Sequence, residues 1–175
     1  MKKYRKWIQS VILLGLFAVA TVTLAAGLAS KEDPPGIGDA APDFVLPGLE
    51  GGEFRLSDYR GRPVVINFWG TYCPPCVAEM PLIQKYYDLY RERGLVVLGV
   101  NENDPVVTAR AFVRQLNLSF PILMDRDRVR KAYGVTAYPT TFFVGGDGRV
   151  VAIEEGEMNE NDLRGALSLL FGTDG

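Results

Sequence analysis

The chain has 175 residues, of which 47% are hydrophobic and 23% are charged, a composition typical of one globular domain. Charge is uneven along it: residues 1–30 contain four cations and no acid, so the remainder holds fifteen cations against 21 acids and has a net charge of −6. An acidic body gives no electrostatic reason to bind nucleic acid. The sequence contains no histidine, which removes the commonest metal ligand and the commonest general base.

The first predicted element is a long apolar segment, residues 7–29, without a charged side chain. It exceeds the roughly 20 residues that a helix needs to span a bilayer, so we predict a retained transmembrane anchor. The alternative is a cleaved signal peptide, in which residues 27–29 would resemble the small-x-small cleavage site. The four cations predict that residues 1–6 form a cytoplasmic tail and that the body lies on the extracytoplasmic side of the cell membrane. Residues 30–39, with their prolines, glycines and charges, are expected to tether a domain over residues 40–175.

The body alternates between predicted strands and helices. Two short extended runs around Gly51-Gly52 indicate a hairpin, and the β-branched run at 63–69 is typical of a strand buried on both faces of a sheet. Apolar residues at intervals of three and four predict a helix that follows the cysteines and ends at Gly94. The further expected elements are a strand at 95–101, a helix with Asp104 as N-cap and Pro105 in its first turn, a strand at 120–125, a helix at 126–133, a hairpin at 140–156 and a helix from Asn159. This alternation predicts an α/β fold around a mixed sheet.

The two cysteines, Cys73 and Cys76, lie within the stretch NFWGTYCPPCVAEMP. They are too few for a zinc site in a chain without histidine. A structural staple that closes so small a loop would remove little entropy from the unfolded chain. The remaining interpretation is a redox pair. Cys73 stands where a buried strand meets a helix, so it should cap the helix N-terminus, where the helix dipole and free N–H groups favour its reactive thiolate. Cys76, one turn further, should be the buried resolving thiol.

This stretch, together with AYPTTF at residues 137–142, resembles the active-site segments of thioredoxin-fold proteins, and more closely the membrane-anchored thiol–disulfide oxidoreductases of the ResA and TlpA type. The resemblance covers most of residues 36–171. It implies a thioredoxin-like fold with a mixed central sheet flanked by helices, an N-terminal β-hairpin and a helix/strand insertion, preceded by one transmembrane helix. It also implies a redox-active disulfide between Cys73 and Cys76, with no cofactor and no metal.

The resemblance assigns a substrate-binding surface as well. Pro139 matches the family's cis-proline, which faces the cysteines and would turn the backbone of Tyr138 toward the sulfurs, so that a substrate peptide can pair as an added strand. An ordinary trans proline before an edge strand is the alternative. Trp69 and Tyr72 are expected to form an apolar collar around Cys73 and to contact substrate, although Trp69 would equally suit the core.

Glu79 is the acid that the resemblance singles out. It lies three residues after Cys76, on the same side of the predicted helix. The strand position that carries a buried Asp in thioredoxins is Asn67 here, which cannot titrate, whereas in ResA-like proteins a Glu matching Glu79 takes part in the active site. We therefore predict that Glu79 has a raised pKa and exchanges a proton with Cys76. A solvated acid of the first helical turn is the alternative.

The tetrapeptide and the resemblance together predict a reductant. Pro74 and Pro75 lack N–H groups, so fewer donors face the sulfur of Cys73 and a low reduction potential is expected. The resemblance implies reduction of the haem-attachment cysteines of apocytochrome c during cytochrome c maturation, with electrons from a membrane-embedded CcdA-like reductase. General or spore-envelope disulfide reduction is the alternative. A peroxidase of the peroxiredoxin kind would need Thr-x-x-Cys, whereas Thr71 is only two residues before Cys73, and a copper-delivery module would need a histidine.

Overall fold

The computed structural model describes residues 4, 12–17, 21 and 33–172. The chain divides into two compact units, residues 1–33 and residues 34–175. In the first unit, residues 12–17 are helical. Most of the predicted tail and of the predicted membrane span at 7–29 lies outside the described residues. Within the part of the chain that is described, no helix is long and apolar enough to cross a membrane.

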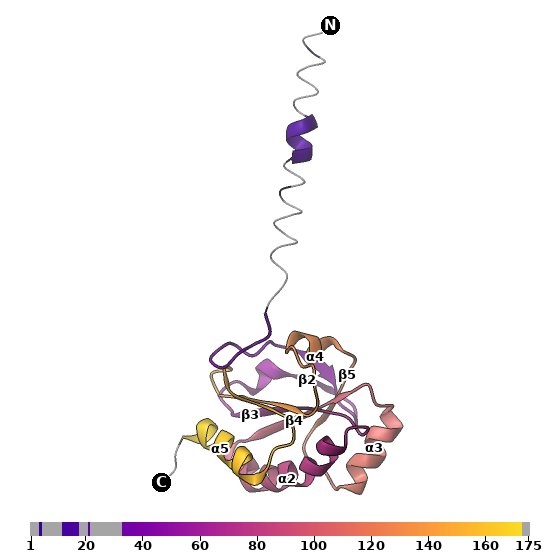
Figure 1. Cartoon of the computed structure of the whole chain (residues 1–175), viewed down its shortest axis with the longest axis vertical. Helices are drawn as coiled ribbons and strands as arrows, with labels where there is room; N and C mark the ends of the chain where they lie inside the picture. The colour runs from indigo at the N-terminus through magenta and orange to yellow at the C-terminus, as the bar shows by residue number, and fades with distance from the viewer. Residues whose placement is uncertain (1–3, 5–11, 18–20, 22–32, 173–175) are drawn as a thin grey trace. The chain divides into compact units, whose positions relative to one another are not determined.

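The second unit is built around a central sheet (Figure 1). It has five strands in the order β5-β4-β3-β6-β7. The strands are β3 (Val64–Trp69), β4 (Val96–Glu102), β5 (Ile122–Asp125), β6 (Thr140–Val144) and β7 (Val150–Glu155). The first three are parallel to one another, and β6 and β7 are antiparallel to their neighbours. Every residue of β3 and β4 is buried, which explains why continuous apolar runs mark them in the sequence. The predicted mixed sheet is confirmed.

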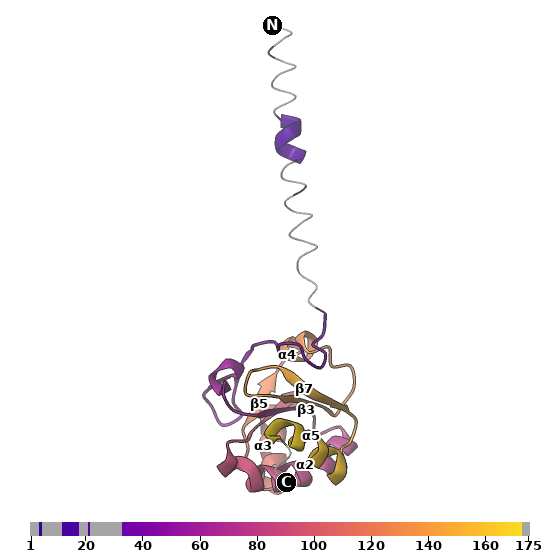
Figure 2. The same ribbon diagram turned by 90° about the vertical axis from the view of Figure 1, so that its left-hand side faces the viewer.

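Helices cover both faces of this sheet, as Figure 2 shows. One face carries α2 (Pro74–Tyr90), α3 (Val106–Gln115) and α5 (Glu160–Phe171), and the short helix η2 (Arg91–Arg93) follows α2. The other face carries α4 (Arg128–Ala132) and the N-terminal hairpin of β1 (Val45–Pro47) and β2 (Glu53–Arg55), followed by η1 (Leu56–Tyr59). Each face has its own apolar core, the first around Met80, Phe143 and Leu163, the second around Phe68 and Tyr133. The thioredoxin-like α/β architecture is therefore confirmed.

The sheet register brings distant segments to one edge. The carboxyl ends of parallel strands meet at the same edge of a sheet, so the chain after Trp69 lies beside the end of β4. On the other side of β3, Thr140 pairs with Phe68. Pro139, directly before Thr140, is therefore placed opposite the segment that leads from Trp69 to the cysteines. This edge of the sheet is where the predicted site residues meet.

Three boundaries differ from those predicted. The compact unit begins at Pro34, before the predicted boundary at residue 40, because the backbone of Gly38 donates to Val150 O over 2.8 Å and Val150 N donates to Asp39 O over 2.9 Å. Helix α3 begins at Val106, with Pro105 and not Asp104 at its N-cap. Helix α4 is shorter than the predicted 126–133. Its N-terminal N–H groups are satisfied by the buried carboxylate at the end of β5, Asp125, which accepts from the backbone of Arg126, Arg128, Val129 and Arg130.

Candidate active site

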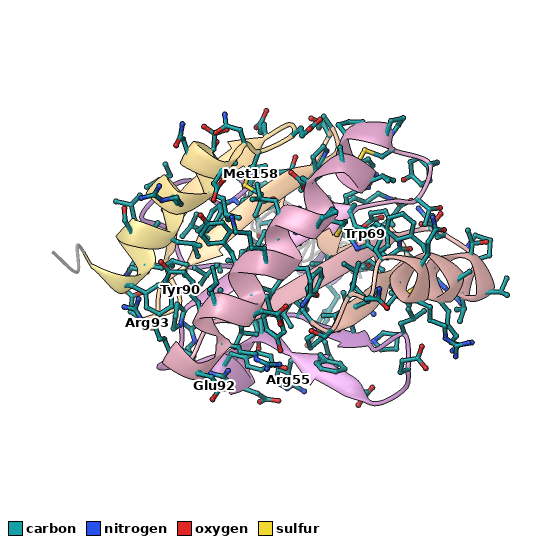
Figure 3. All side chains as sticks on the ribbon, turned by 90° about the horizontal axis from the view of Figure 1, so that it is seen from below. Arg55, Trp69, Tyr90, Glu92, Arg93 and Met158 are labelled. Carbon is teal, nitrogen blue, oxygen red and sulfur yellow. A yellow bond between two sulfur atoms is a disulfide. The ribbon has the colours of Figure 1, made fainter. Side chains whose placement is uncertain are left out.

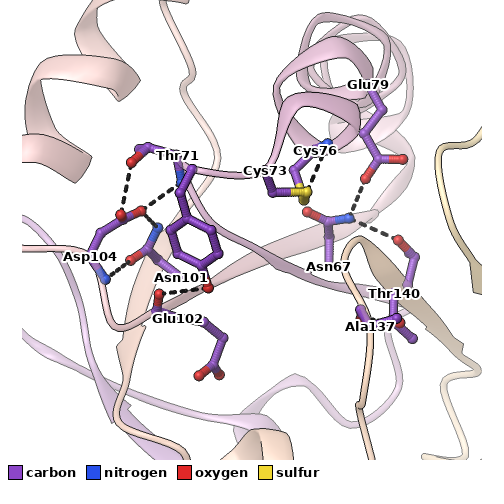
Figure 4. Close-up of a disulfide and its surroundings, with 12 residues drawn as sticks. Asn67, Thr71, Cys73, Cys76, Glu79, Asn101, Glu102, Asp104, Ala137 and Thr140 are labelled. Atoms are coloured by element: carbon purple, nitrogen blue, oxygen red, sulfur yellow. Dashed lines mark hydrogen bonds between the residues drawn. A yellow bond between two sulfur atoms is a disulfide. The ribbon is translucent and has the colours of Figure 1, made fainter.

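Cys73 and Cys76 form a disulfide at the N-terminus of α2 (Figure 4). Cys73 is the N-cap residue of the helix, and its sulfur accepts a hydrogen bond from Cys76 N over 3.3 Å. The exposed fraction is 8% for Cys73 and 0% for Cys76. Pro74 and Pro75 occupy the first helical positions, so Cys76 carries the first N–H group that can reach the capping sulfur. A free N-terminal N–H group and the helix dipole both favour negative charge at Cys73 when the pair is reduced.

The aromatic surface beside the disulfide comes from two loops. The peptide bond between Tyr138 and Pro139 is cis, and Pro139 O accepts a hydrogen bond from Gly156 N over 2.8 Å. The ring of Tyr138 meets the ring of Tyr72 edge to face, with centroids 6.3 Å apart. Tyr72 is 57% exposed, and its hydroxyl donates to Glu102 O over 3.4 Å. The structure thus places Tyr72, Tyr138 and Pro139 together, and their contact with substrate stays a prediction.

Trp69 does not lie on this surface. Its side chain is fully buried, with an exposed fraction of 0%, and packs against Phe112 of α3 with ring centroids 5.1 Å apart. Figure 3 shows Trp69 beside α3 and Met158 beside α5, on either side of α2. The prediction that Trp69 contacts substrate is therefore wrong for this structure, because the last residue of β3 turns into the core between the sheet and the helices. Trp69 is therefore part of the core that packs against α3 and not part of the aromatic surface beside the disulfide.

Glu79 is buried in the structure, with an exposed fraction of 1%, so the solvated alternative is wrong. Its Oε1 accepts a hydrogen bond from Asn67 Nδ2 over 2.7 Å, and its Oε2 accepts from Met158 N over 3.0 Å. Burial raises the pKa of Glu79 to about 7, because the loss of water outweighs these two hydrogen bonds, which favour the charged form. A carboxyl group with this pKa exchanges protons readily at neutral pH. Its exchange with Cys76 remains a prediction.

The position of Asn67 was predicted only as one that cannot titrate. Its amide, buried on β3, donates to Thr141 Oγ1 over 2.8 Å as well as to Glu79. Its Oδ1 atom has no hydrogen-bond partner among the described residues. Figure 4 shows this side chain between the strand and Glu79, in the surroundings of the disulfide. Asn67 therefore fixes the position of the Glu79 carboxyl group.

Two acidic residues at the end of β4 were missed as site residues. The carboxylate of Asp104 accepts from Thr71 N and Thr71 Oγ1, both over 2.8 Å, and from Asn101 Nδ2 over 2.7 Å. These bonds hold the loop before Cys73 against the start of α3. From the sequence we predicted Asp104 as a helix N-cap, because an Asp before Pro is the common signal of one.

Glu102 is the second of these residues. It is fully buried, and neither of its carboxylate oxygens has a hydrogen-bond partner in the described part of the chain. Arg130 Nε is 4.0 Å from Oε2, and Asp125 is the cross-strand neighbour in the register of β4 and β5. Burial, and after it the Asp125 carboxylate, raise the pKa of Glu102 to about 8. No sequence signal marks this residue, because a charged residue at a strand end is usually exposed.

The residues described by the structure include no group of three or more His, Cys, Asp or Glu side chains that could hold a metal ion. The groups at the site that can exchange electrons and protons are the two sulfur atoms of the disulfide and the buried carboxyl group of Glu79. A disulfide at a helix N-terminus, with one sulfur near the surface and the other inside, is suited to thiol–disulfide exchange.

Comparisons with known proteins agree with this geometry. The profile of the AhpC/TSA family matches residues 37–153. The chain is 42% identical to the thiol–disulfide oxidoreductase ResA of Geobacillus thermodenitrificans over 166 residues. This stretch covers 94% of this chain and 95% of that protein. It is 36% identical to ResA of Halalkalibacterium halodurans, over 97% of both chains. A solved structure of a secreted Mycobacterium tuberculosis disulfide oxidoreductase homologous to DsbE superposes with a TM-score of 0.67 at 26% identity, over 73% of this chain and 96% of that one.

Proposed function

The chain belongs to the AhpC/TSA family and is a thiol–disulfide oxidoreductase of the ResA type, and from this premise we propose that it acts as a reductant of protein disulfides outside the cell membrane. The direction of electron transfer is inferred from the first turn of α2, beside Cys73. Pro74 and Pro75 have no N–H group to donate in the first turn of α2. The thiolate of Cys73 is therefore less stabilised than it would be with other residues at these two positions. A less stabilised thiolate goes with a more stable disulfide and a lower reduction potential.

The proposed reaction is a two-step exchange. The Cys73 thiolate attacks one sulfur of the substrate disulfide, forming a mixed disulfide and releasing one substrate thiolate. Cys76 then gives its proton to Glu79 and attacks the sulfur of Cys73, which breaks the mixed disulfide and releases the second substrate thiolate. Two electrons pass to the substrate, whose sulfurs take up two protons, and the protein is left with the Cys73–Cys76 disulfide.

Glu79 is suited to the second step by its place and its pKa. Cys76 is fully buried, so water does not readily remove its proton. Glu79 lies one helical turn further along α2, and its pKa of about 7 lets it accept a proton and later release it at neutral pH. Asn67 and the backbone of Met158 hold the carboxyl group in place. Tyr138 and Pro139 would receive the substrate backbone beside the sulfurs.

The substrate and the location are part of the same proposal. We infer that residues 7–29 anchor the protein and that the domain faces outward, supported by the apolar run and the four cations that precede it. The proposed substrate is apocytochrome c with its two haem-attachment cysteines oxidised, and the proposed electron donor is a membrane-embedded reductase of the CcdA kind. An oxidising compartment makes such a donor necessary, since each turnover leaves the protein as a disulfide.

The test is to trap the substrate in cells. Replacing Cys76 by Ala removes the resolving thiol, so the mixed disulfide on Cys73 should accumulate. We expect mass spectrometry of the trapped species to identify a polypeptide with a Cys-x-x-Cys-His motif, and a Cys73→Ala control to trap nothing. Recovery only of other extracytoplasmic proteins would favour general or spore-envelope reduction. Absence of any trapped partner would contradict the proposed role as a reductant of protein disulfides.

A further inference from the structure

A groove of about 440 Å³ lies along α3, next to the loop that carries the cysteines. The described residues that line it are Thr71, Val107, Thr108, Ala111, Phe112 and Gln115. None of these is charged, although the body of the chain is acidic. Their side chains carry two hydroxyls and one amide. The Thr71 hydroxyl already donates to Asp104, so the Thr108 hydroxyl and the Gln115 amide are the side-chain groups that suit the backbone of a passing polypeptide.

Three exposed apolar residues line the groove or are chain neighbours of residues that line it. In the described part of the second unit, six large apolar side chains are exposed: Ile37, Tyr72, Leu89, Val106, Val107 and Leu169. Three of them, Tyr72, Val106 and Val107, belong to the loop before Cys73 and to the start of α3. Val107 is 72% exposed and lies in the first turn of α3. Apolar side chains that cluster at the surface mark an interaction site more often than scattered ones do.

The groove and the disulfide are held at a fixed separation. Thr71 lines the groove and is two residues from Cys73, and its N–H and hydroxyl both donate to the carboxylate of Asp104 over 2.8 Å. Asp104 in turn stands two residues before the start of α3. Figure 4 shows these bonds beside the disulfide. A group bound in the groove is therefore positioned relative to the reacting sulfurs.

The floor of the groove is rigid for a separate reason. Phe112 lies against Trp69, with ring centroids 5.1 Å apart, and Trp69 is fixed in β3 at the centre of the sheet. Figure 3 shows Trp69 beside α3. This contact gives the buried Trp69 a role other than direct contact with substrate. It fixes the position of Phe112, the floor residue against which an apolar side chain would pack.

We propose that this groove is a second binding site for the polypeptide substrate, and that it takes one apolar side chain from the segment flanking the substrate disulfide. The inference rests on the proposed reduction of protein disulfides and adds a determinant of specificity to it. Its occupant is a polypeptide because Thr71, two residues before Cys73, joins the groove to the loop of the reacting disulfide, and because none of the lining side chains is charged. The Thr71–Asp104 bonds set the distance between that side chain and the disulfide, so only one position in the substrate can use the groove.

The test compares disulfide peptides with the reduced full-length protein in detergent. Each peptide carries an oxidised Cys-x-x-Cys motif in a Ser-rich background, with a single Leu placed at successive positions on either side. We expect the second-order rate constant for reduction of one Leu peptide to exceed that of the all-Ser peptide by about tenfold, the usual discrimination of an apolar pocket. The other positions should resemble the all-Ser peptide.

Two variants assign this preference to the groove. Ala111→Arg fills the groove from the exposed face of α3 and should abolish the preference, so that the ratio of the Leu peptide to the all-Ser peptide falls to about one. Val107→Ser, a milder change at an exposed position, should reduce it in part. Leu169→Arg on α5 is the matched control, since it places the same charge on an exposed helix position and should keep the preference. Thermal unfolding of each variant verifies the fold.

Three outcomes overturn the inference or its premise, and they are distinguishable. Equal second-order rate constants for all Leu positions in the unmodified protein would contradict the groove as a binding site. A preference that Ala111→Arg and Val107→Ser leave unchanged would place it elsewhere on the surface. Failure to reduce any of the peptides, including the all-Ser one, would contradict the proposed reductant function itself and the inference with it.

Discussion

Replacing Glu79 by Gln tests whether a buried carboxyl group beside the disulfide titrates near neutral pH. Burial raises the pKa of Glu79 to about 7, from an ordinary value of 4.5. The folded state then binds this proton more tightly than the unfolded state, so the free energy of unfolding falls as the pH rises from 4.5 to about 7 and levels off above it. At roughly 1.4 kcal/mol for each pKa unit, the fall due to Glu79 is about 3 kcal/mol.

The assay is urea unfolding of the oxidised full-length protein and of the Glu79→Gln variant, at pH 5 and at pH 8. All other titrating groups contribute to both proteins, so the difference between their pH dependences isolates Glu79. We expect the unmodified protein to lose about 2.5 kcal/mol more than the variant between the two pH values, because part of the effect lies below pH 5. Parallel pH dependences would show that the carboxyl group ionises at its ordinary pKa in the folded protein, and the argument for proton exchange would fail.

The same variant separates a structural from a catalytic role. A flipped Asn67 amide can accept through Oδ1 from the new amide group, so the hydrogen bond between residues 67 and 79 is kept in the variant. We expect the variant to fold and to form the disulfide, but to reduce a protein disulfide roughly 10²–10⁴-fold more slowly. Mixed disulfide should accumulate because the resolving step is slowed. Unchanged turnover would leave Glu79 a structural role only.

The remaining predictions concern the thiols, two acids and the topology. In reduced protein, Cys73 should be alkylated much faster than the fully buried Cys76, and equal rates would contradict the capping geometry. Asp104→Ala removes the acceptor of three hydrogen bonds and should lower the free energy of unfolding by about 2 kcal/mol in urea; an unchanged midpoint would contradict this. Because burial raises the pKa of Glu102 to about 8, Glu102→Gln should gain stability relative to the unmodified protein between pH 5 and pH 9, and no relative gain would refute it. Protease added to intact spheroplasts should remove the domain, whereas protection would refute the outward orientation.

The elements with local signals were predicted closely. The strand expected at 63–69 is β3 at Val64–Trp69, and the final helix begins after Asn159, whose side chain accepts from Asn161 N and Asp162 N as a capping residue. In both cases the signal is local: a run of β-branched residues, or a cap directly before an amphipathic pattern. The junction that places Cys73 at the N-terminus of α2 was predictable for the same reason.

The polar network of the site was not predictable in this way. Asp104 bonds Thr71, which is 33 positions earlier in the chain, and only the parallel pairing of β3 and β4 brings the two together. Glu102 is buried because α4 and the loop with Tyr138 cover the end of its strand. No pattern in the neighbouring sequence predicts this burial. The burial of Trp69 depends likewise on Phe112 in a distant helix.

The measurement that tests the central claim most directly is a single turnover between the reduced full-length protein and an oxidised Cys-x-x-Cys-His peptide, followed by mass spectrometry. The account predicts one reduced peptide for each Cys73–Cys76 disulfide formed, with a transient mixed disulfide on Cys73, and no reaction for Cys73→Ser. A peptide that stays oxidised in the presence of excess reduced protein, or a mixed disulfide that forms on Cys76 instead, would contradict it.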